Sequence, residues 1–440
     1  VLIAVIVSMA IFFSIKIKIK RNTYIDDVTE GLNYNRFIID AKTLSKTSSD
    51  YAVVLTDTIK FKYINEQIGK QKGDDLLKSV HDYYLSKLAK DELIARVYAD
   101  RFILFIHNND LENRLLAMYD EVKKKIFKEY NITLYNVYGV FNPNKKIYDV
   151  TFSSNMARVA LLSIKDNYAL TPIGFFENSM YVNEVTLNTL EQKADSAMRN
   201  HNFIVYYQGK RNIQNETWCS CEALVRWKDT DGTLISPGKF IPLFERNGFI
   251  TQLDLYIFEN VCCDIRRAID NGKKPIAASI NVSRKHFINK DFLSNYKEII
   301  DKYDIPYNLI EFEITESAVF ENENILVDIV NQIHQMGCTC SIDDFGTGYS
   351  SLSMLTNYDF DIIKLDRSFF YGKNGFTDSS KQVVKTLIDL AHKLNKKVVA
   401  EGIEELEVVN FLKDNKCDII QGFYYARPLP KDEFLKLVSE

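Results

Sequence analysis

Eight short apolar segments alternate with helical patterns between residues 183 and 440, and this alternation constrains the fold more than any other feature of the chain. The helical patterns include residues 253–270, 325–336 and 381–394. Strands that alternate with helices over about 250 residues are typical of a (β/α)8 barrel. We therefore expect a TIM-like barrel, with strands at residues 204–208, 221–227, 276–281, 310–315, 339–343, 361–364, 397–401 and 418–421.

The preceding part of the chain, residues 24–181, has its own pattern and its own expected domain. The 440 residues are enough for two or three domains, each with a core. Alternating strands and helices here predict a compact α/β domain with one central sheet. The expected strands are 51–57, 92–98, 102–107 and 132–140, and the expected helices are 74–90 and 151–165.

The first residues of the chain are apolar and precede a basic cluster. Residues 1–15 carry no charge, and Lys16, Lys18, Lys20 and Arg21 follow. A cleaved signal peptide fits poorly, because the charges come after the apolar stretch. We expect residues 1–21 to be a single-pass transmembrane anchor, or the end of one, with the later domains in the cytoplasm. The formal net charge of -4 gives no reason to expect DNA binding.

Polar side chains recur where the barrel strands end, which is where barrel enzymes carry their active sites. A single carboxylate there can be a helix cap or half of an ion pair. Several carboxylates converging on one mouth would repel each other and raise their own pKa values, and a hard divalent cation removes that cost. Oxygen ligands suit Mg²⁺ or Mn²⁺ better than zinc. The residues concerned are Glu222, Asn281, Glu313, Glu316, Asp343, Asp344, Lys364, Asp366, Glu401 and Gln421.

Two cations about 3.5–4 Å apart are the usual clamp for in-line attack on a phosphodiester. We expect two cations per active site and expect the carboxylate of Asp343 to bridge them. A bound water would then become hydroxide near neutral pH.

Several separated motifs in this part of the chain resemble one known family. The segment Glu222-Ala223-Leu224 precedes Arg226-Trp227, and Glu313-Ile314-Thr315-Glu316-Ser317 is intact. Together these motifs resemble the EAL family of cyclic di-GMP phosphodiesterases across the whole second block. The other motifs are Asn281-Val282-Ser283, residues 343–352 (DDFGTGYSSL), Lys364-Leu365-Asp366, Ala400-Glu401-Gly402-Ile403-Glu404 and Gln421-Gly422-Phe423.

The resemblance implies a role for each matching residue, with cyclic di-GMP as substrate and linear pGpG as product. It further implies that Glu316 fixes the loop after Asp344, which connects the active site to a homodimer interface in the family. The implied metal ligands are Glu222, Asn281, Glu313, Asp343, Asp344 and Glu401; the implied catalytic residues are Glu401, Lys364, Asp344 and Glu316; and the implied substrate-binding residues are Arg226, Gln208, Gln421, Asp366 and Glu404.

Few residues depart from the family pattern. Gly209 stands where proline is common after Gln208, Leu365 stands where isoleucine is common, and Ile403 replaces a valine. These are packing changes that leave the implied ligand set complete. The complete set favours an enzyme over the alternative, a receptor that binds cyclic di-GMP without cleaving it.

The first block resembles a GGDEF domain, the family that makes cyclic di-GMP from GTP. Residues 26–37 resemble its opening signature, and Lys165 matches a phosphate-contacting lysine. The signature turn, however, reads Tyr98-Ala99-Asp100-Arg101-Phe102, where the family has glycines that let the backbone approach phosphates. We therefore expect no cyclase activity, and the R-x-x-D inhibition motif is replaced by Ala89 and Glu92.

Two interpretations of GTP binding fit the residues of this domain. Asp57 and Asp100 could hold Mg²⁺, and Asn65 with Asp74 could read guanine. A GTP-sensing domain and a domain kept only for dimerisation are both compatible with these residues, and Tyr98 favours the second by crowding a triphosphate.

Overall fold

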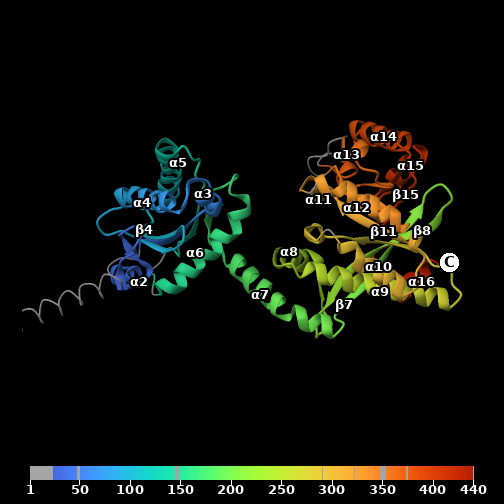
Figure 1. Ribbon diagram of the computed structural model, residues 1–440, viewed down its shortest axis with the longest axis horizontal. Helices are drawn as coiled ribbons and strands as arrows, with labels where there is room; N and C mark the ends of the chain where they lie inside the picture. Colours follow the sequence, from blue (N-terminus) through green and yellow to red (C-terminus); the bar gives the residue numbers. More distant parts are fainter. Residues whose placement is uncertain are drawn as a thin grey trace, which may run out of the picture. The chain divides into compact units, whose positions relative to one another are not determined.

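The computed structural model describes residues 23–46, 50–143, 147, 149–289, 291–321, 323–346, 353–372 and 375–439. The chain divides between Thr186 and Leu187 into two compact units, coloured blue to green and green to red in Figure 1. Helix α7 (Asn178–Arg199) carries the chain across this division.

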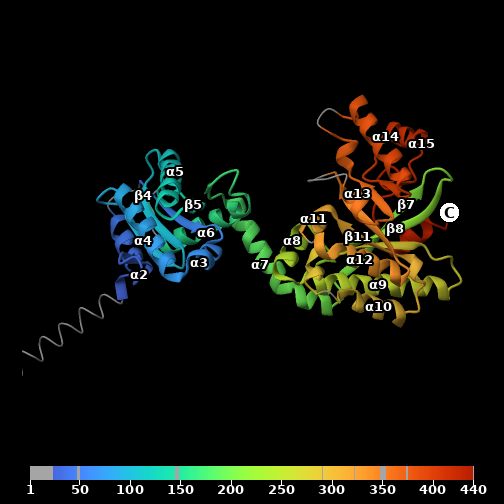
Figure 2. The ribbon, with the colours of Figure 1, turned by 45° about the horizontal axis from the view of Figure 1, so that its top comes forward.

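The first unit is a six-stranded sheet with helices on both faces (Figures 1 and 2). Alternate residues of the central strand β2 enter opposite cores, with Val54 on the face of α3, α4 and α5 and Val53 on the face of α2 and α6. The strand order is β1-β3-β4-β2-β5-β6, with bounds β1 Leu32–Asn33, β2 Tyr51–Thr58, β3 Leu93–Tyr98, β4 Arg101–His107, β5 Asn136–Phe141 and β6 Ile173–Phe175. The helices are α2 Tyr34–Leu44, α3 Phe61–Ile68, α4 Lys70–Lys87, α5 Leu111–Tyr130, α6 Val150–Ile164 and η1 Lys165–Asn167.

The second unit contains a closed barrel of eight strands, as expected. The ring order is β7-β15-β14-β13-β12-β11-β10-β8, and pairing of β8 with β7 closes it. The short strands β9 (Leu234–Ile235) and β16 (Leu429–Pro430) pair at its margin. The ring strands are β7 Phe203–Asn212, β8 Thr217–Lys228, β10 Ala277–Asn281, β11 Ile310–Thr315, β12 Thr339–Phe345, β13 Ile362–Leu365, β14 Lys397–Ala400 and β15 Ile419–Ile420.

One strand departs from the regular (β/α)8 pattern. Strand β7 is antiparallel to both of its ring neighbours, whereas the other neighbouring ring strands are parallel. The reason is the connection: residues 213–216 link β7 to β8 as a hairpin, and only antiparallel strands can be joined by so short a turn. The helices of this unit are α8 Pro237–Asn247, α9 Ile250–Asp270, η2 Arg284–Ile288, α10 Phe292–Lys302, η3 Tyr307–Leu309, α11 Glu316–Glu321, α12 Glu323–Met336, α13 Ser353–Asn357, η4 Arg367–Phe369, α14 Asp378–Lys393, α15 Leu406–Asp414 and α16 Lys431–Leu437.

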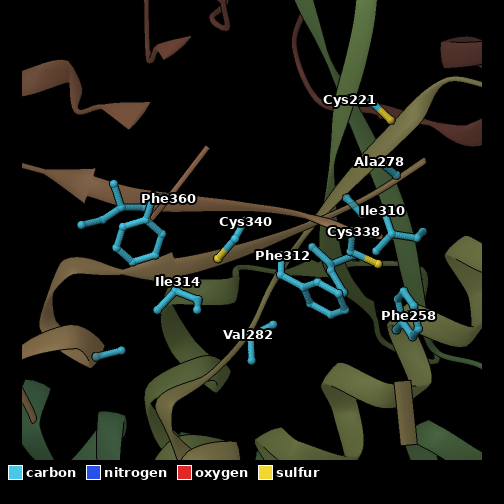
Figure 3. Close-up of a cluster of buried hydrophobic side chains, with 14 of the residues drawn as sticks. Cys221, Phe258, Ala278, Val282, Ile310, Phe312, Ile314, Cys338, Cys340 and Phe360 are labelled. Carbon is cyan, nitrogen blue, oxygen red and sulfur yellow. The ribbon is translucent and has the colours of Figure 1, made fainter. Parts of the chain in front are cut away.

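The period of two along each barrel strand separates the packing residues from the chemical ones. In β11 the apolar Ile310, Phe312 and Ile314 belong to the core that packs against the surrounding helices, and Phe258 of α9 lies against Phe312 (Figure 3). The intervening Glu311 and Glu313 are buried and make contacts across the barrel interior. The same alternation therefore places apolar side chains in the outer core and carboxylates in the barrel lumen.

The membrane localisation expected from the first residues is corrected. In the ranges given above, no helix combines the length and the apolarity needed to cross a bilayer. The segment on which that expectation was placed, residues 1–21, lies outside the described residues.

Candidate active site

A buried lysine lies at the centre of the carboxylate cluster at the barrel mouth. Lys364, at the end of β13, is 1% exposed, and its Nζ lies 2.8 Å from Glu313 Oε2, 2.9 Å from Asp343 Oδ1 and 2.8 Å from Glu401 Oε1. These three carboxylates come from β11, β12 and the residue after β14. Strand ends far apart in the sequence therefore converge on one ammonium group.

A second set of hydrogen bonds holds Glu222 on the β8 side of the same mouth. Gln421 Nε2 donates to Glu222 Oε2 at 2.6 Å and to Gln208 Oε1 at 3.1 Å. Asn281 Nδ2 donates to Glu222 Oε1 at 2.9 Å, and Gln208 Nε2 donates to the Ala426 carbonyl at 3.0 Å. Both oxygens of Glu222 thus accept hydrogen bonds from side-chain amides, and these fix the orientation of the carboxylate.

Two consecutive aspartates face the mouth because β12 is irregular where it ends. In a regular strand neighbouring side chains point to opposite faces. Here the register to β13 shifts between Ile342 and Phe345, and Asp344 has a φ of 55°. Carboxylate oxygens of Asp343, Asp344 and Glu401 consequently lie within 4.8 Å of one another, a spacing that a shared cation would suit.

Burial and the charges of neighbouring groups both act on the pKa values of the clustered carboxylates. Burial raises the pKa of Glu222 and of Glu401, and neighbouring carboxylates raise both further while Lys364 lowers them. Burial, followed by Asp343, raises the pKa of Asp344 to about 6. Burial also acts to raise the pKa of Glu313, but Lys210 and Lys364 outweigh it and hold that pKa at about 2.

Lys210 is a site residue that the sequence reasoning missed. It is fully buried on β7, and its Nζ donates to Ser279 Oγ at 2.8 Å and to Glu313 Oε1 at 2.8 Å, with Glu311 Oε1 at 3.3 Å. Lys210 and Lys364 therefore contact Glu313 through its two different oxygens, and both lysines offset the negative charge of the cluster. A signal existed in the sequence, because Lys210 follows Gln208 at the strand period of two and must share its face.

Three other residues assigned to this site lie around the cluster. Glu316 is buried at the start of α11, and its Oε2 accepts from the Gly346 amide at 3.0 Å, at the end of β12. Asp366 caps η4 by accepting from the Ser368 amide at 2.8 Å, and its charge also raises the pKa of Asp344. Glu404 is exposed, with Arg367 at 3.8 Å, and the structure gives it no contact with the central carboxylates among the described residues.

A cavity of about 400 Å³ adjoins the mouth beside Asn281. Apolar side chains such as Leu224 and Ile241 line it. Two guanidinium groups, of Arg226 and Arg284, and two carboxylates, of Glu245 and Asp254, also line it. Arg226 also lies over the ring of Tyr206, at 5.5 Å from its centre. Such a pocket is suited to a flat polar ring that carries an anionic group.

The nucleotide site considered for the first unit contains its own cations. Asp57 pairs with Lys165 and lies 3.6 Å from Arg101, while Asp100 Oδ2 accepts from the Thr58 amide at 2.9 Å. Burial, followed by Asp57, raises the pKa of Asp100 to about 6. Arg101 also stacks on the ring of Tyr98, which is 57% exposed at the turn.

The other two residues considered for GTP lie on neighbouring helices. Asn65 belongs to α3, and its side-chain oxygen occupies the space beside Gly73 of α4, where a Cβ would approach it to 1.8 Å. Asp74 follows Gly73 on α4. The structure thus brings Asp57 and Asp100 together, and the guanine-reading role of Asn65 and Asp74 stays a prediction.

Comparison with known proteins assigns the family. The model of the EAL domain matches residues 191–428, which is more than half of the chain. The chain belongs to the EAL domain family. A second model, diguanylate cyclase, GGDEF domain, matches residues 24–138, so both resemblances noted in the sequence are confirmed, in the order GGDEF then EAL. EAL domains depend on divalent metal ions, in agreement with the carboxylate cluster at this mouth.

Two curated relatives match over most of the chain. Signaling protein YkoW of Bacillus subtilis is 29% identical over 433 residues, covering 96% of this chain and 54% of that protein. Cyclic di-GMP phosphodiesterase PdeR of Escherichia coli is 29% identical over 426 residues, covering 95% of this chain and 63% of that protein. The chain thus spans about half to three-fifths of the length of these relatives.

Two solved structures are similar to more than half of the chain. The PaMucR phosphodiesterase in complex with c-di-GMP matches with a TM-score of 0.53 and 30% identity, over 56% of this chain and 99% of that one. The EAL enzyme Bd1971 bound to cAMP and cyclic di-GMP matches with a TM-score of 0.55 and 27% identity, over 77% of this chain and 81% of that one.

Proposed function

We propose that this EAL domain hydrolyses cyclic di-GMP to linear pGpG with two divalent cations, Mg²⁺ or Mn²⁺, at the barrel mouth. The observation that carries the proposal is the charge imbalance there. Among the described residues, six carboxylates surround two lysine ammonium groups, and burial in such an arrangement is costly without further cations. The six are Glu222, Glu311, Glu313, Asp343, Asp344 and Glu401, and the lysines are Lys210 and Lys364.

The residues present fit such a pair of cations. The donors at the mouth are carboxylate and amide oxygens, the ligand type that Mg²⁺ and Mn²⁺ prefer. Gln421 Oε1 is buried and accepts no hydrogen bond from the described part of the chain, so it can orient a water at the site. Glu222, Asn281, Glu313 and Asp343 would hold one cation, and Asp343, Asp344 and Glu401 the other.

The side chains around the cations have separate tasks. Bound divalent cations supply charge stabilisation for the phosphodiester and lower the pKa of a water molecule. Lys364 would hold the attacking water or a phosphate oxygen, and Glu401 would accept a proton at its carboxylate. Arg226, on the wall of the adjoining cavity, would hold a phosphate with a guanine base nearby.

The relatives support this substrate. PdeR carries the name cyclic di-GMP phosphodiesterase, and the PaMucR structure is a complex with c-di-GMP. The donor arrangement described above matches what hydrolysis of a cyclic dinucleotide needs. We also infer that the EAL domain self-associates, with Glu316 linking the end of β12 to that interface through the Gly346 amide. Light scattering of the purified chain tests the self-association.

For the GGDEF domain we propose no cyclase activity. Tyr98 and Ala99 stand at the turn that must admit a triphosphate, and Arg101 reverses the charge expected there. Asp57 already pairs with Lys165 and lies near Arg101. These two cations offset the negative charge that a metal ion would otherwise balance. Incubation of the full chain with GTP and Mg²⁺ should give no cyclic di-GMP. Thermal unfolding and hydrolysis rates measured with and without GTP decide whether the domain senses this nucleotide.

The hydrolase proposal is tested by incubating the full chain with cyclic di-GMP and Mg²⁺ or Mn²⁺, followed by chromatography. We expect pGpG, none in EDTA, and recovery on adding metal back. Glu222→Gln should abolish the product, whereas Glu298→Gln, an exposed change on α10, should not. Tight binding of cyclic di-GMP without any pGpG would select a receptor instead and overturn the proposal.

A further inference from the structure

A second and larger cavity lies away from the carboxylate cluster. It measures about 1000 Å³ and is bounded by the hairpin of β7 and β8, the end of α9, the segment before β10, and α16. Thr217 and Trp218 begin β8, and Pro275 precedes β10, so this cavity lies toward the ends of the strands opposite the mouth. Figures 1 and 2 both show the hairpin close to the last residues of the chain. None of the carboxylates of the mouth lines it.

One wall of this cavity is aromatic and cationic. The rings of Trp218 and Tyr425 lie edge to face at 6.4 Å, and the guanidinium of Arg211 lies 5.4 Å and 5.0 Å from their centres. Arg211 Nε is buried and donates to no acceptor in the described part of the chain. A buried N–H without an acceptor is costly, so the wall presents a donor that a ligand oxygen would satisfy.

The wall depends on a departure already noted in the sequence. Gly209 stands where the family commonly has proline, and a Cβ there would meet the Trp218 ring at 2.6 Å. The absence of a side chain at residue 209 therefore makes room for the indole. Gly209 and Trp218 form one feature of this chain, separate from the residues of the mouth.

The remaining lining gives the cavity a net positive charge. Its two acids are already paired, Asp264 with Lys431 and Glu216 with Lys413. Lys273 and Lys274 at the rim form no ion pair within the described ranges. Together with Arg211 they leave three cations among the lining residues. The lining also has an apolar side formed by residues that include Ile265, Ala268, Ile276, Leu435 and Val438.

We propose that this cavity binds a nucleotide at a site separate from the barrel mouth. The base lies between the aromatic wall and the apolar side, and the phosphates meet Arg211, Lys273 and Lys274. A volume of about 1000 Å³ accommodates a ligand of that size. Stacking on aromatic rings supplies part of the affinity, and the cationic rim supplies the rest. The proposal does not depend on the phosphodiesterase activity.

Tryptophan fluorescence of the full chain tests the proposal. The chain has two tryptophans, and Trp227 is 1% exposed in the core, so Trp218 reports on the cavity. ATP and GTP, titrated separately in EDTA, should change the emission, and Trp218→Phe should remove the change. The double change Lys273→Glu with Lys274→Glu should weaken binding at least tenfold. Lys385→Glu, an exposed change on α14, should not.

Adenosine and tripolyphosphate separate the two halves of the expected ligand. Each should bind at least tenfold more weakly than ATP, because each lacks one of the two groups that the cavity receives. Tripolyphosphate binding as tightly as ATP would mean a site for phosphate alone and would overturn the nucleotide assignment. The proposal also fails if both nucleotides leave the Trp218 emission unchanged, or if the double variant binds them as tightly as the unaltered chain.

Discussion

Replacing Lys210 by methionine should destabilise the EAL barrel strongly and in a pH-dependent way. Methionine fills a similar volume but removes the ammonium that contacts Ser279, Glu311 and Glu313. The loss takes from Glu311 its lysine partner and leaves Glu313 with Lys364 alone. Breaking a buried pair by removing one partner costs about 3–5 kcal/mol.

The pKa of Glu313 gives an independent magnitude. Its value of about 2, against 4.5 for an ordinary glutamate, corresponds to about 3 kcal/mol of stability at neutral pH, which Lys210 and Lys364 supply together. A lowered carboxylate pKa stabilises the fold above about pH 4.5, and this contribution is lost as the pH falls toward 2. Lys210→Met removes one of the two cations that lower this pKa, so we expect the full penalty at neutral pH and a smaller one as the pH falls from 4.5 toward 2.

Urea unfolding in EDTA, followed by tryptophan fluorescence, measures this penalty, because both tryptophans lie in the EAL unit. The matched control is Lys396→Met. Lys396 is 6% exposed and donates to the Phe360 carbonyl at 2.7 Å, but its acidic partner Asp359 is 85% exposed. We expect the control to lose about 1 kcal/mol at either pH. A loss below about 1 kcal/mol for Lys210→Met at pH 7.5, or an equal loss at about pH 3.5 and pH 7.5, would refute the reasoning.

Three further outcomes are expected. Glu222→Ala should reduce hydrolysis of cyclic di-GMP by several orders of magnitude, measured as pGpG formed, and a loss below tenfold would exclude it as a metal ligand. The pKa of Asp100 is raised to about 6 from 3.8, so its contribution to stability is full below about pH 4 and is lost as the pH rises through 6. Asp100→Asn should therefore stabilise the first unit at pH 8 and not at pH 4, as measured by calorimetry. Gly209→Ala should cost about 1–3 kcal/mol in urea unfolding because its Cβ meets Trp218. Combining it with Trp218→Val should recover most of that loss, and an additive double variant would contradict the steric explanation.

The sequence was informative about the elements and about which polar residues gather at the barrel mouth. The eight barrel strands lie close to the residues expected for them, because each is a short apolar run bounded by polar residues. Their polar ends predicted that Glu313, Asp343, Lys364 and Glu401 share one mouth, and these side chains do meet there. The membrane localisation expected from the apolar first residues and the basic cluster after them was wrong, since no helix of the described residues could span a bilayer.

Features that depend on pairing between distant strands could not be read from the chain. The antiparallel direction of β7 follows from its hairpin with β8, whereas its pairing with β15, which closes the ring, joins segments about 200 residues apart. Asp344 reaches the mouth through a register shift in β12, although an ideal strand would point it away. The role of Lys210 required knowing that β7 lies opposite β11 across the lumen.

The sequence by itself determined the period of two that places apolar side chains toward the helices and acids toward the lumen. Tertiary structure decided which charges meet, because closing the barrel brings together side chains more than a hundred residues apart, such as Lys210 and Glu313. Burial then sets their pKa values through distances that no local pattern encodes.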